Sequence, residues 1–320
     1  MSGGTADTAG EVIAVDLGGT KTAVARVDRH GTCGPVTTRP TPARQGPDSV
    51  LATVAEAVQK VAGAGPPVVA VGVGAAGVID TATGTVVSAT DAITGWPGTQ
   101  IADVLHERLG LPVVVDNDVN AHAAGEAWLG AGRGARNVLL VAVGTGVGGA
   151  VVLNGQPLRG AHHAAGEIGH VPVRGAMHLR CACGRAGHLE ALASGPGLLR
   201  HYHSLGGDPT LTDTRGVVER ARAADELSLQ VVRDAAAALG TCLAGVVTLL
   251  DPDVVVVGGG LAEAGEVWWE PMELVLRSEL IDILADVAIK PAELGINAAL
   301  VGAGHLAWSR LTYDREEAPL

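Results

Sequence analysis

Apolar and polar residues alternate in short blocks along the chain, and these blocks predict strands and helices. Residues 11–17 are apolar and rich in β-branched side chains, which predicts a strand, and after Gly18 and Gly19 residues 20–27 predict a second, antiparallel strand. Further strands are predicted over 68–73, 113–115, 138–143, 150–153 and 254–257, and helices over 47–62, 98–109, 119–130, 189–205, 228–250, 266–284 and 299–311. This mixture predicts an α/β fold.

A strand, a glycine turn and a returning strand occur twice. The stretches are IAVDLGGTKTAVARV near the start and LLVAVGTGVGGAVVL near the middle. This repeat predicts a duplicated fold of two lobes with a cleft between them. We expect the first lobe over 11–118, with the closing helix near 299–311 packing back on it. The second lobe is expected over 119–298, with an insertion near 154–190 that holds most of the histidines.

The composition excludes several classes of protein. Hydrophobic residues make up 47% of the 320 residues and charged residues 18%, which is typical of a globular chain and not of a disordered one. The formal net charge of −12 argues against a broad nucleic-acid surface and against binding to anionic membranes. The most apolar helical stretch, 235–250, is short for a membrane span and contains threonines, so we expect a buried core helix.

The N-terminal sequence and the number of cysteines indicate the cellular compartment of the protein. The first eleven residues contain no basic segment followed by an apolar one, so no signal peptide is expected. Four cysteines in 320 residues do not suggest a disulfide scaffold. We therefore expect a cytoplasmic protein.

The first glycine turn carries candidate chemistry. Gly18 and Gly19 let the backbone approach a phosphate, and Thr20 can donate a hydrogen bond to a phosphate oxygen. Asp16 can hold Mg²⁺ through water, because Mg²⁺ favours carboxylates while it keeps much of its hydration. The candidate nucleotide-binding residues of this turn are Asp16, Gly18, Gly19, Thr20 and Lys21. The alternative is an ordinary glycine hairpin in which Lys21 is solvated.

The second glycine turn lies at the matching place in the second half. It lacks the ending of a Walker loop and is followed by a strand, so it fits neither a Walker nor a Rossmann motif. As a pair, the two turns predict two phosphate cradles that face one cleft. A third run of glycines follows the strand 254–257, where a flat ligand could lie against the backbone, although a simple strand-to-helix turn explains it as well. The candidate residues here are Gly144, Thr145, Gly146, Gly148, Gly259 and Gly260.

Three polar residues, Asp116, Asn117 and Asp118, lie between a predicted strand and helix. One of them can simply cap the helix, which is the common reason for Asp or Asn at such a place. A carboxylate here can also accept the proton of a sugar hydroxyl as its oxygen attacks phosphorus.

Histidines and cysteines cluster later in the chain. His170 is followed by Cys181, Cys183 and His188, a set that could form a closed tetrahedral Zn²⁺ site. Close cysteines among histidines indicate metal binding more than redox chemistry. A lone histidine would be read as an ordinary polar residue, and the prediction depends on the cluster.

In order and content, these motifs resemble the ROK family of repressors and kinases. The likeness runs from Asp16 to about Gly304 through DLGGTK, DNDVNAHAAGE, GTGVGG, GEIGH, CACGRAGHLE and VVVVGGG. The resemblance implies an actin-like, ribonuclease H-like fold, ATP with Mg²⁺, structural Zn²⁺ and a homodimer.

The resemblance also implies roles for residues. Asp118 would be the catalytic base, and His170 would bind zinc through one ring nitrogen while the other faces the sugar. The glycine turns would hold ATP between the lobes. The residues that would contact the sugar are Gly77, Asn117, Asp118, Glu167, His170 and Glu190, and the zinc ligands are His170, Cys181, Cys183 and His188.

Three departures from the family pattern concern zinc and sugar. His188 stands where the family usually has a third zinc-binding cysteine. Asp91 and Ala92 replace a Pro-Asn pair whose Asn meets the sugar, and residues 74–77 read Gly-Ala-Ala-Gly in place of Gly-x-Pro-Gly. The identity of the sugar therefore stays open.

The sequence predicts phosphorylation of a hexose, at the 6-hydroxyl, with a glucokinase-like activity first and an N-acetylmannosamine kinase close behind. One alternative is a sugar-responsive regulator without kinase activity, but only fifteen residues precede Asp16, too few for a helix-turn-helix module. Another is a zinc-stapled sugar-binding protein without catalysis. Polyphosphate as donor would call for a more basic groove.

Overall fold

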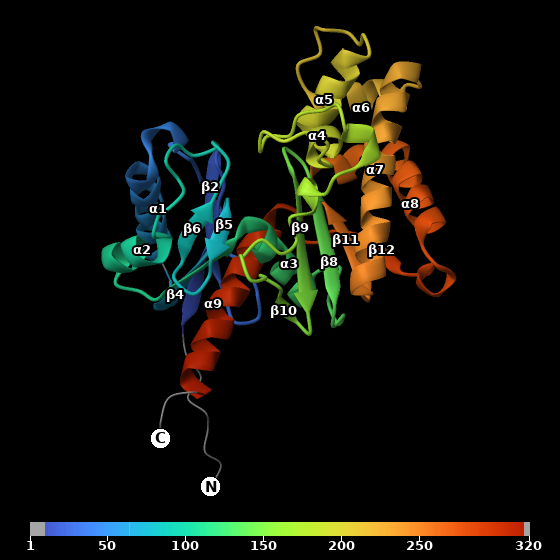
Figure 1. The fold of residues 1–320 in the computed structure, drawn as a ribbon. Helices are drawn as coiled ribbons and strands as arrows, with labels where there is room; N and C mark the ends of the chain where they lie inside the picture. Colours follow the sequence, from blue (N-terminus) through green and yellow to red (C-terminus); the bar gives the residue numbers. More distant parts are fainter. Residues whose placement is uncertain (1–9, 64, 317–320) are drawn as a thin grey trace. The chain divides into compact units, whose positions relative to one another are not determined.

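Each of the two glycine turns joins a pair of antiparallel strands (Figure 1). Strand β1 (Glu11–Leu17) pairs with β2 (Lys21–Val27), and β8 (Val138–Val143) pairs with β9 (Val147–Leu153). This is a computed structural model, and it describes residues 10–63 and 65–316. Residues 1–9, on which the signal-peptide prediction largely rests, lie outside these ranges.

The two hairpins begin two sheets of the same topology. The first sheet has the order β3-β2-β1-β4-β7 and the second β10-β9-β8-β11-β12, so each runs third, second, first, fourth, fifth in chain order. In each, the first three strands are antiparallel and the last two are parallel to the first. The remaining strands are β3 (Thr37–Pro40), β4 (Val68–Ala75), β7 (Val113–Asn117), β10 (Gln156–Pro157), β11 (Val254–Gly258) and β12 (Ala288–Pro291), with a separate pair, β5 (Val78–Asp80) and β6 (Thr85–Ser88). The predicted α/β class and its duplication are confirmed.

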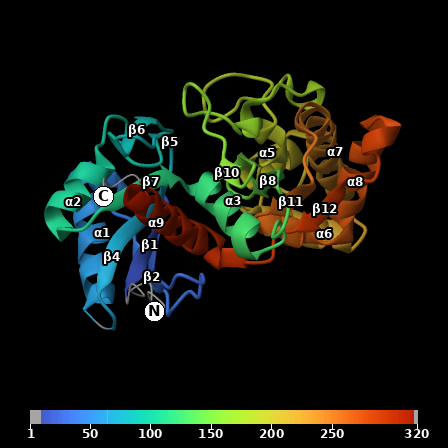
Figure 2. The same cartoon turned by 90° about the horizontal axis from the view of Figure 1, so that it is seen from below.

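The first sheet is covered by helices on both faces (Figure 2). Because side chains alternate along a strand, Ile13 and Val15 of β1 pack with α1 (Pro47–Ala62) and α2 (Ile101–Leu109). Val12 and Ala14 point to the other face, where α3 (Asp118–Leu129) and α9 (Ala298–Glu316) cover them. The core on this second face is built mainly from alanines, so the helices can approach the sheet closely.

The chain divides into two compact units. One takes in the chain as far as Arg133, Gly160–His163 and the chain from Ile296, and the other Gly134–Arg159 with Ala164–Gly295. The predicted boundary after residue 118 differs from this division, because α3 packs against α9 within the first unit. At that crossing a Cβ atom on Gly302 would collide with the backbone carbonyl of Ala121, so only glycine fits there.

The second sheet packs against long helices on one face. These include α7 (Glu226–Leu250) and α8 (Glu266–Glu279), and α7 contributes buried residues along most of its length. Helix α7 is long and apolar enough to cross a membrane by length and composition, but 56% of its most apolar stretch is buried in the structure. It therefore packs as a core helix. The other helices of this unit are α4 (Glu190–Ala193), α5 (Gly195–Ser204) and α6 (Thr214–Arg222).

Some elements differ from those predicted. The expected helix 189–205 is broken at Ser194, whose hydroxyl caps α5 by accepting a hydrogen bond from the Gly197 N–H at 3.1 Å. The helix expected over 266–284 ends at Glu279. Helix α6 and strands β3, β5, β6, β10 and β12 were not predicted, because they are short or weakly patterned.

Two glycines of α7 provide a matched test of the packing. Gly240 is buried where α7 meets α8, and a Cβ atom there would collide with the carbonyl oxygen of Met272, whereas a Cβ at exposed Gly245 would meet nothing within 4 Å. We expect Gly240→Ala to destabilise the protein by about 1–3 kcal/mol through overpacking. Gly245→Ala should stabilise it by up to about 1 kcal/mol through helix propensity. Urea denaturation of both variants measures this, and equal effects would contradict the packing described here.

Candidate functional site

Carboxylates lie at the carboxyl ends of β1 and β7, the parallel strands on either side of β4 in the first unit. Asp16 of β1 is in register with Gly74 of β4, which is in register with Asp116 of β7. Burial raises the pKa of the Asp16 carboxyl, and the charge of Lys21 opposes this shift. The predicted phosphate turn and Asp116 therefore share one edge of this sheet.

The glycine turn after β1 is held by threonine. The Gly18 N–H donates to the Lys21 carbonyl at 3.0 Å, and the Thr41 hydroxyl donates to the Gly18 carbonyl at 2.8 Å. A Cβ atom on Gly19 would lie 3.0 Å from the Ala92 side chain, so the segment that departs from the family pattern packs against this turn.

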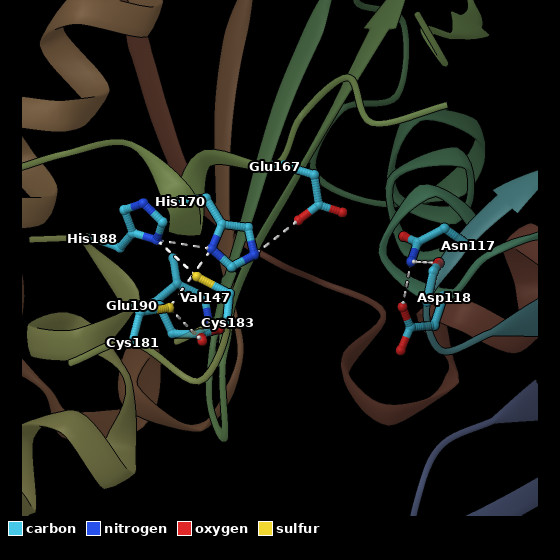
Figure 3. Close-up of polar contacts among 10 residues, drawn as sticks. Asn117, Asp118, Val147, Glu167, His170, Cys181, Cys183, His188 and Glu190 are labelled. Atoms are coloured by element: carbon cyan, nitrogen blue, oxygen red, sulfur yellow. Dashed lines mark hydrogen bonds and ion pairs between the residues drawn. The ribbon is translucent and has the colours of Figure 1, made fainter. Parts of the chain in front are cut away.

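Asn117 links the end of β7 to the loop after β4. Its side-chain oxygen accepts hydrogen bonds from the N–H groups of Val119 and Asn120 at 2.8 and 3.1 Å, so it caps α3. Its side-chain nitrogen donates to the Gly77 carbonyl and to Asp118 Oδ1, both at 2.9 Å (Figure 3). Hydrogen bonds of Asn117 thus join the three predicted residues Gly77, Asn117 and Asp118. Asn117 both caps α3 and belongs to the candidate site.

Asp118 is held in a defined orientation. Its Oδ1 accepts from the Asn117 side chain and from the Val119 N–H, both at 2.9 Å. The neighbouring loop is anchored as well, because the Trp96 indole N–H donates to the Ala76 carbonyl at 2.8 Å. Gly77 has a φ of 107°, and a Cβ there would lie 2.8 Å from the Ser88 carbonyl oxygen, so glycine is required.

The second unit holds a cavity of about 580 Å³ beside the second glycine turn. The starts of α5 and α6 form part of its wall, and backbone N–H groups at helix starts favour anions. Its lining residues are Gly144, Thr145, Gly195, Pro196, Asp213, Thr214, Arg215, Val218, Glu219, Arg222, Gly260, Leu261, Glu263 and Ala264.

Hydrogen bonds join the walls of this cavity. The Gly195 N–H donates to the Gly144 carbonyl at 2.8 Å, and the Thr214 hydroxyl donates to the Gly195 carbonyl at 2.6 Å. Arg222 donates to the carbonyls of Glu263 and Ala264 at 2.7 and 3.0 Å. The glycine turn, α5, α6 and the 3₁₀ turn Gly260–Ala264 are therefore tied into one frame.

Of the predicted glycine-loop residues in this unit, Gly144, Thr145 and Gly260 line the cavity, whereas Gly146, Gly148 and Gly259 are not among its lining residues. Gly259 has a φ of 88°, and a Cβ there would collide with the backbone of Val143, so this glycine serves close backbone packing.

Sequence reasoning missed the cavity residues contributed by α5 and α6. The Ser-Gly-Pro start of α5 and the Asp that caps α6 are signals that could have marked both helix starts. Their place beside Gly144 could not be read from the sequence, because it depends on contacts between distant segments.

The four predicted metal ligands gather at one point of the second unit (Figure 3). His170 Nδ1 lies 3.2 Å from His188 Nδ1 and 3.7 Å from Cys181 Sγ, and Cys183 Sγ lies 3.2 Å from His188 Nδ1. All four ligand atoms are within 4.8 Å of one another. The structure thus brings the whole predicted set together.

These spacings fit a tetrahedral zinc ion. With zinc bonds of about 2.0–2.3 Å, the edges of a tetrahedron are about 3.3–3.8 Å long. Three of the six separations, at 3.2–3.7 Å, are close to these edges, and the other three are within 4.8 Å. Burial raises the pKa of the Cys181 thiol to about 11. Two sulfur and two imidazole donors are a set that zinc prefers.

Two acidic residues border this cluster. Glu167 Oε2 lies 3.8 Å from His170 Nε2, the ring nitrogen that points away from the cluster. Burial raises the pKa of Glu167, while His170 opposes the shift and Glu190 adds to it. Glu190 contacts the backbone N–H of Val147 and the Cys181 thiol.

Comparison with known proteins gives matches over nearly the whole chain. A model of the ROK family matches residues 12–310. A glucokinase from Halalkalibacterium halodurans is 35% identical over 311 residues, which cover 92% of this chain and 94% of that protein.

Solved structures match as well. A ROK hexokinase from Thermus thermophilus has a TM-score of 0.82 at 34% identity and covers 95% of this chain and 99% of that one. A ROK family glucokinase from Streptomyces griseus in complex with glucose and AMPPNP has a TM-score of 0.79 at 34% identity, and the match covers 94% and 100% of the two chains.

The hydrogen bonds of Asn117 can be tested by measuring the free energy of unfolding of two variants. Asn117→Ala removes the cap of α3 and the bond to the Gly77 carbonyl, so we expect a loss of about 1–2 kcal/mol in the free energy of unfolding. Asn117→Asp keeps the capping oxygen, so its free energy of unfolding should fall by less than that of Asn117→Ala. Urea denaturation measures both, and an alanine variant as stable as the unaltered protein would show that the cap does not form.

Proposed function

Because the chain belongs to the ROK family, we propose that this ATP-dependent sugar kinase phosphorylates a hexose at the 6-hydroxyl, with glucose as the first candidate. The observation that carries this proposal is the 35% identity to a glucokinase over 92% of the chain. The actin-like α/β fold follows from the ROK hexokinase and glucokinase structures that the chain matches.

The cavity of the second unit supports binding of the nucleotide. The turn at Gly144 and the start of α6 offer backbone N–H groups to phosphates, and Val218, Leu261 and Ala264 supply apolar surface for a base. In the first unit, Asp16 and the turn that begins at Gly18 supply a carboxylate and further N–H groups. Mg²⁺, which such a carboxylate can hold, offsets charge that develops on the transferred phosphoryl group.

Asp118 is the group we assign as general base. The hydrogen bonds from Asn117 and Val119 to Oδ1 fix its carboxylate, as a base must be positioned before it can accept a proton. Asp118 would take the proton of the sugar hydroxyl while that oxygen attacks the γ-phosphorus and the bond to ADP breaks. Gly77, Asn117, Glu167, His170 and Glu190 are proposed to bind the sugar.

The His/Cys cluster is proposed to hold structural zinc. Closed sets of four sulfur and nitrogen donors stabilise loops that have little core of their own. Here the loop from His170 to His188 is closed by short bridges, Pro172 to His188 and Arg180 to Ala186. Zinc would fix this loop and keep the His170 ring oriented, with Nε2 beside Glu167.

The kinase proposal is tested by an ADP-coupled screen over glucose, mannose, N-acetylmannosamine, N-acetylglucosamine, allose and fructose. We expect turnover with glucose, and loss of about 10²–10⁴-fold in kcat for Asp118→Asn, because the amide cannot accept the proton. The variant should stay folded, since its side-chain oxygen can still accept from Val119.

A matched control is Asp48→Asn, which changes an exposed aspartate in the first turn of α1. It should leave kcat unchanged. A preference for N-acetylmannosamine would change the assigned sugar, whereas wild-type-like turnover by Asp118→Asn would remove this residue from the mechanism.

Zinc is tested on the purified protein. We expect a single zinc ion per chain, and Cys183→Ser should weaken zinc binding at least about tenfold and lower the thermal midpoint, because one of four ligands is replaced by a poor one. Metal analysis and thermal unfolding measure these effects. Cys33→Ser, outside the cluster, is the control, and equal zinc content in both variants would argue against the site.

A further inference from the structure

Glu190 lies between the His/Cys cluster and the glycine turn at Gly144. Its Oε2 accepts a hydrogen bond from the Val147 N–H at 3.1 Å, and its Oε1 accepts from the Cys181 thiol at 3.5 Å. One carboxylate thus contacts a member of the cluster and the backbone of the turn (Figure 3). The family resemblance implies that Glu190 contacts the sugar, and that role involves neither its bond to Val147 nor its bond to Cys181.

The position of Glu190 is set by its neighbours. It begins α4, two residues after the ligand His188, and the preceding Leu189 N–H donates to the Val171 carbonyl at 2.9 Å. A Cβ atom on Gly146 would come 2.7 Å from Glu190 Oε2, so the carboxylate lies directly against the turn. The residues that would bind metal and the residue that contacts the turn therefore belong to one short segment.

The contact leaves other donors of the turn available. The Gly144 carbonyl is taken by the Gly195 N–H, and the Val147 N–H is taken by Glu190. Across residues 10–63 and 65–316, the backbone N–H groups of Thr145 and Gly146 donate no hydrogen bond. Thr145 lines the cavity, so with the two ends of the turn held an anion could be bound there at little further loss of conformational entropy.

We propose that Glu190 is a positioning residue that couples the His/Cys cluster to nucleotide binding. Metal held by His188, two residues before Glu190, would order the start of α4 and keep the Glu190 carboxylate on the Val147 N–H. The Cys181 thiol would lose its proton to the solvent on binding metal, so the coupling would run through this segment and not through the thiol hydrogen bond. The turn would then be ready for phosphate before any sugar binds. The inference rests on the proposed nucleotide site, and it adds a role for Glu190 that is separate from a sugar contact.

The test is the affinity for a fluorescent ATP analogue with Mg²⁺, measured without sugar. Glu190→Ala should weaken binding at least about tenfold, because a hydrogen bond to a charged group is lost. Glu190→Gln keeps an oxygen that can accept from Val147 and should stay within about threefold. Glu279→Ala is the control, since Glu279 is an exposed glutamate at the end of α8, and it should bind the analogue like the unaltered protein.

Removal of metal gives a second readout. A chelator should weaken analogue binding by the unaltered protein and by Glu279→Ala, but should weaken binding by Glu190→Ala no further. Thermal unfolding shows whether each sample stays folded. If Glu190→Ala is unfolded, the analogue affinity of the unaltered protein after chelation, measured while it is still folded, tests the coupling.

Three outcomes decide against parts of this account. Unchanged sugar-free affinity in folded Glu190→Ala would overturn the coupling and leave Glu190 as a sugar contact only. Unchanged affinity in folded, metal-free unaltered protein would overturn it as well. Failure of the unaltered protein to bind the analogue at all would overturn the proposed function and this inference together.

Discussion

The hydrogen bond from the Gly195 N–H to the Gly144 carbonyl is the contact on which the second unit's site depends. It joins the tip of a β-hairpin to the start of α5, and Thr214 then joins α5 to α6. A Cβ atom on Gly195 would come 3.2 Å from the Gly144 carbonyl oxygen, so glycine at position 195 favours this close approach. The frame of the cavity therefore combines one backbone contact with side-chain bonds from Thr214 and Arg222.

Much of this could be predicted from residues alone. The repeated strand-turn-strand pattern predicted a duplicated fold of two lobes, since alternation and glycine turns are local signals. The shared strand order of the two sheets was not predicted. The four metal ligands were also found from their spacing, because a loop of that length can return to one point. Helix α6 and the break at Ser194 were missed although Asp213 and the Ser-Gly-Pro sequence mark them locally. The cavity wall at Arg222 could not be predicted, because it depends on contacts between segments far apart in the chain, which no local pattern encodes.

The predicted sugar residues illustrate a further limit. Gly77, Asn117 and Asp118 are joined by hydrogen bonds, so a helix cap and a candidate base share one network. Glu190 was assigned to the sugar by resemblance alone, yet its contacts are with Val147 and Cys181. Motif matching identifies which residues matter, whereas their hydrogen-bond partners indicate how each one acts.

The discontinuous first unit has a consequence for synthesis on the ribosome. Its sheet is complete once β7 has emerged, but α9, which covers Val12 and Ala14, is among the last segments to be made. The whole of the second unit is translated in between. Domains that emerge early tend to fold first. Here α3 follows β7 at once, so this face of the early sheet is covered by α3 alone until α9 is made, whereas the second unit has all of its residues before then.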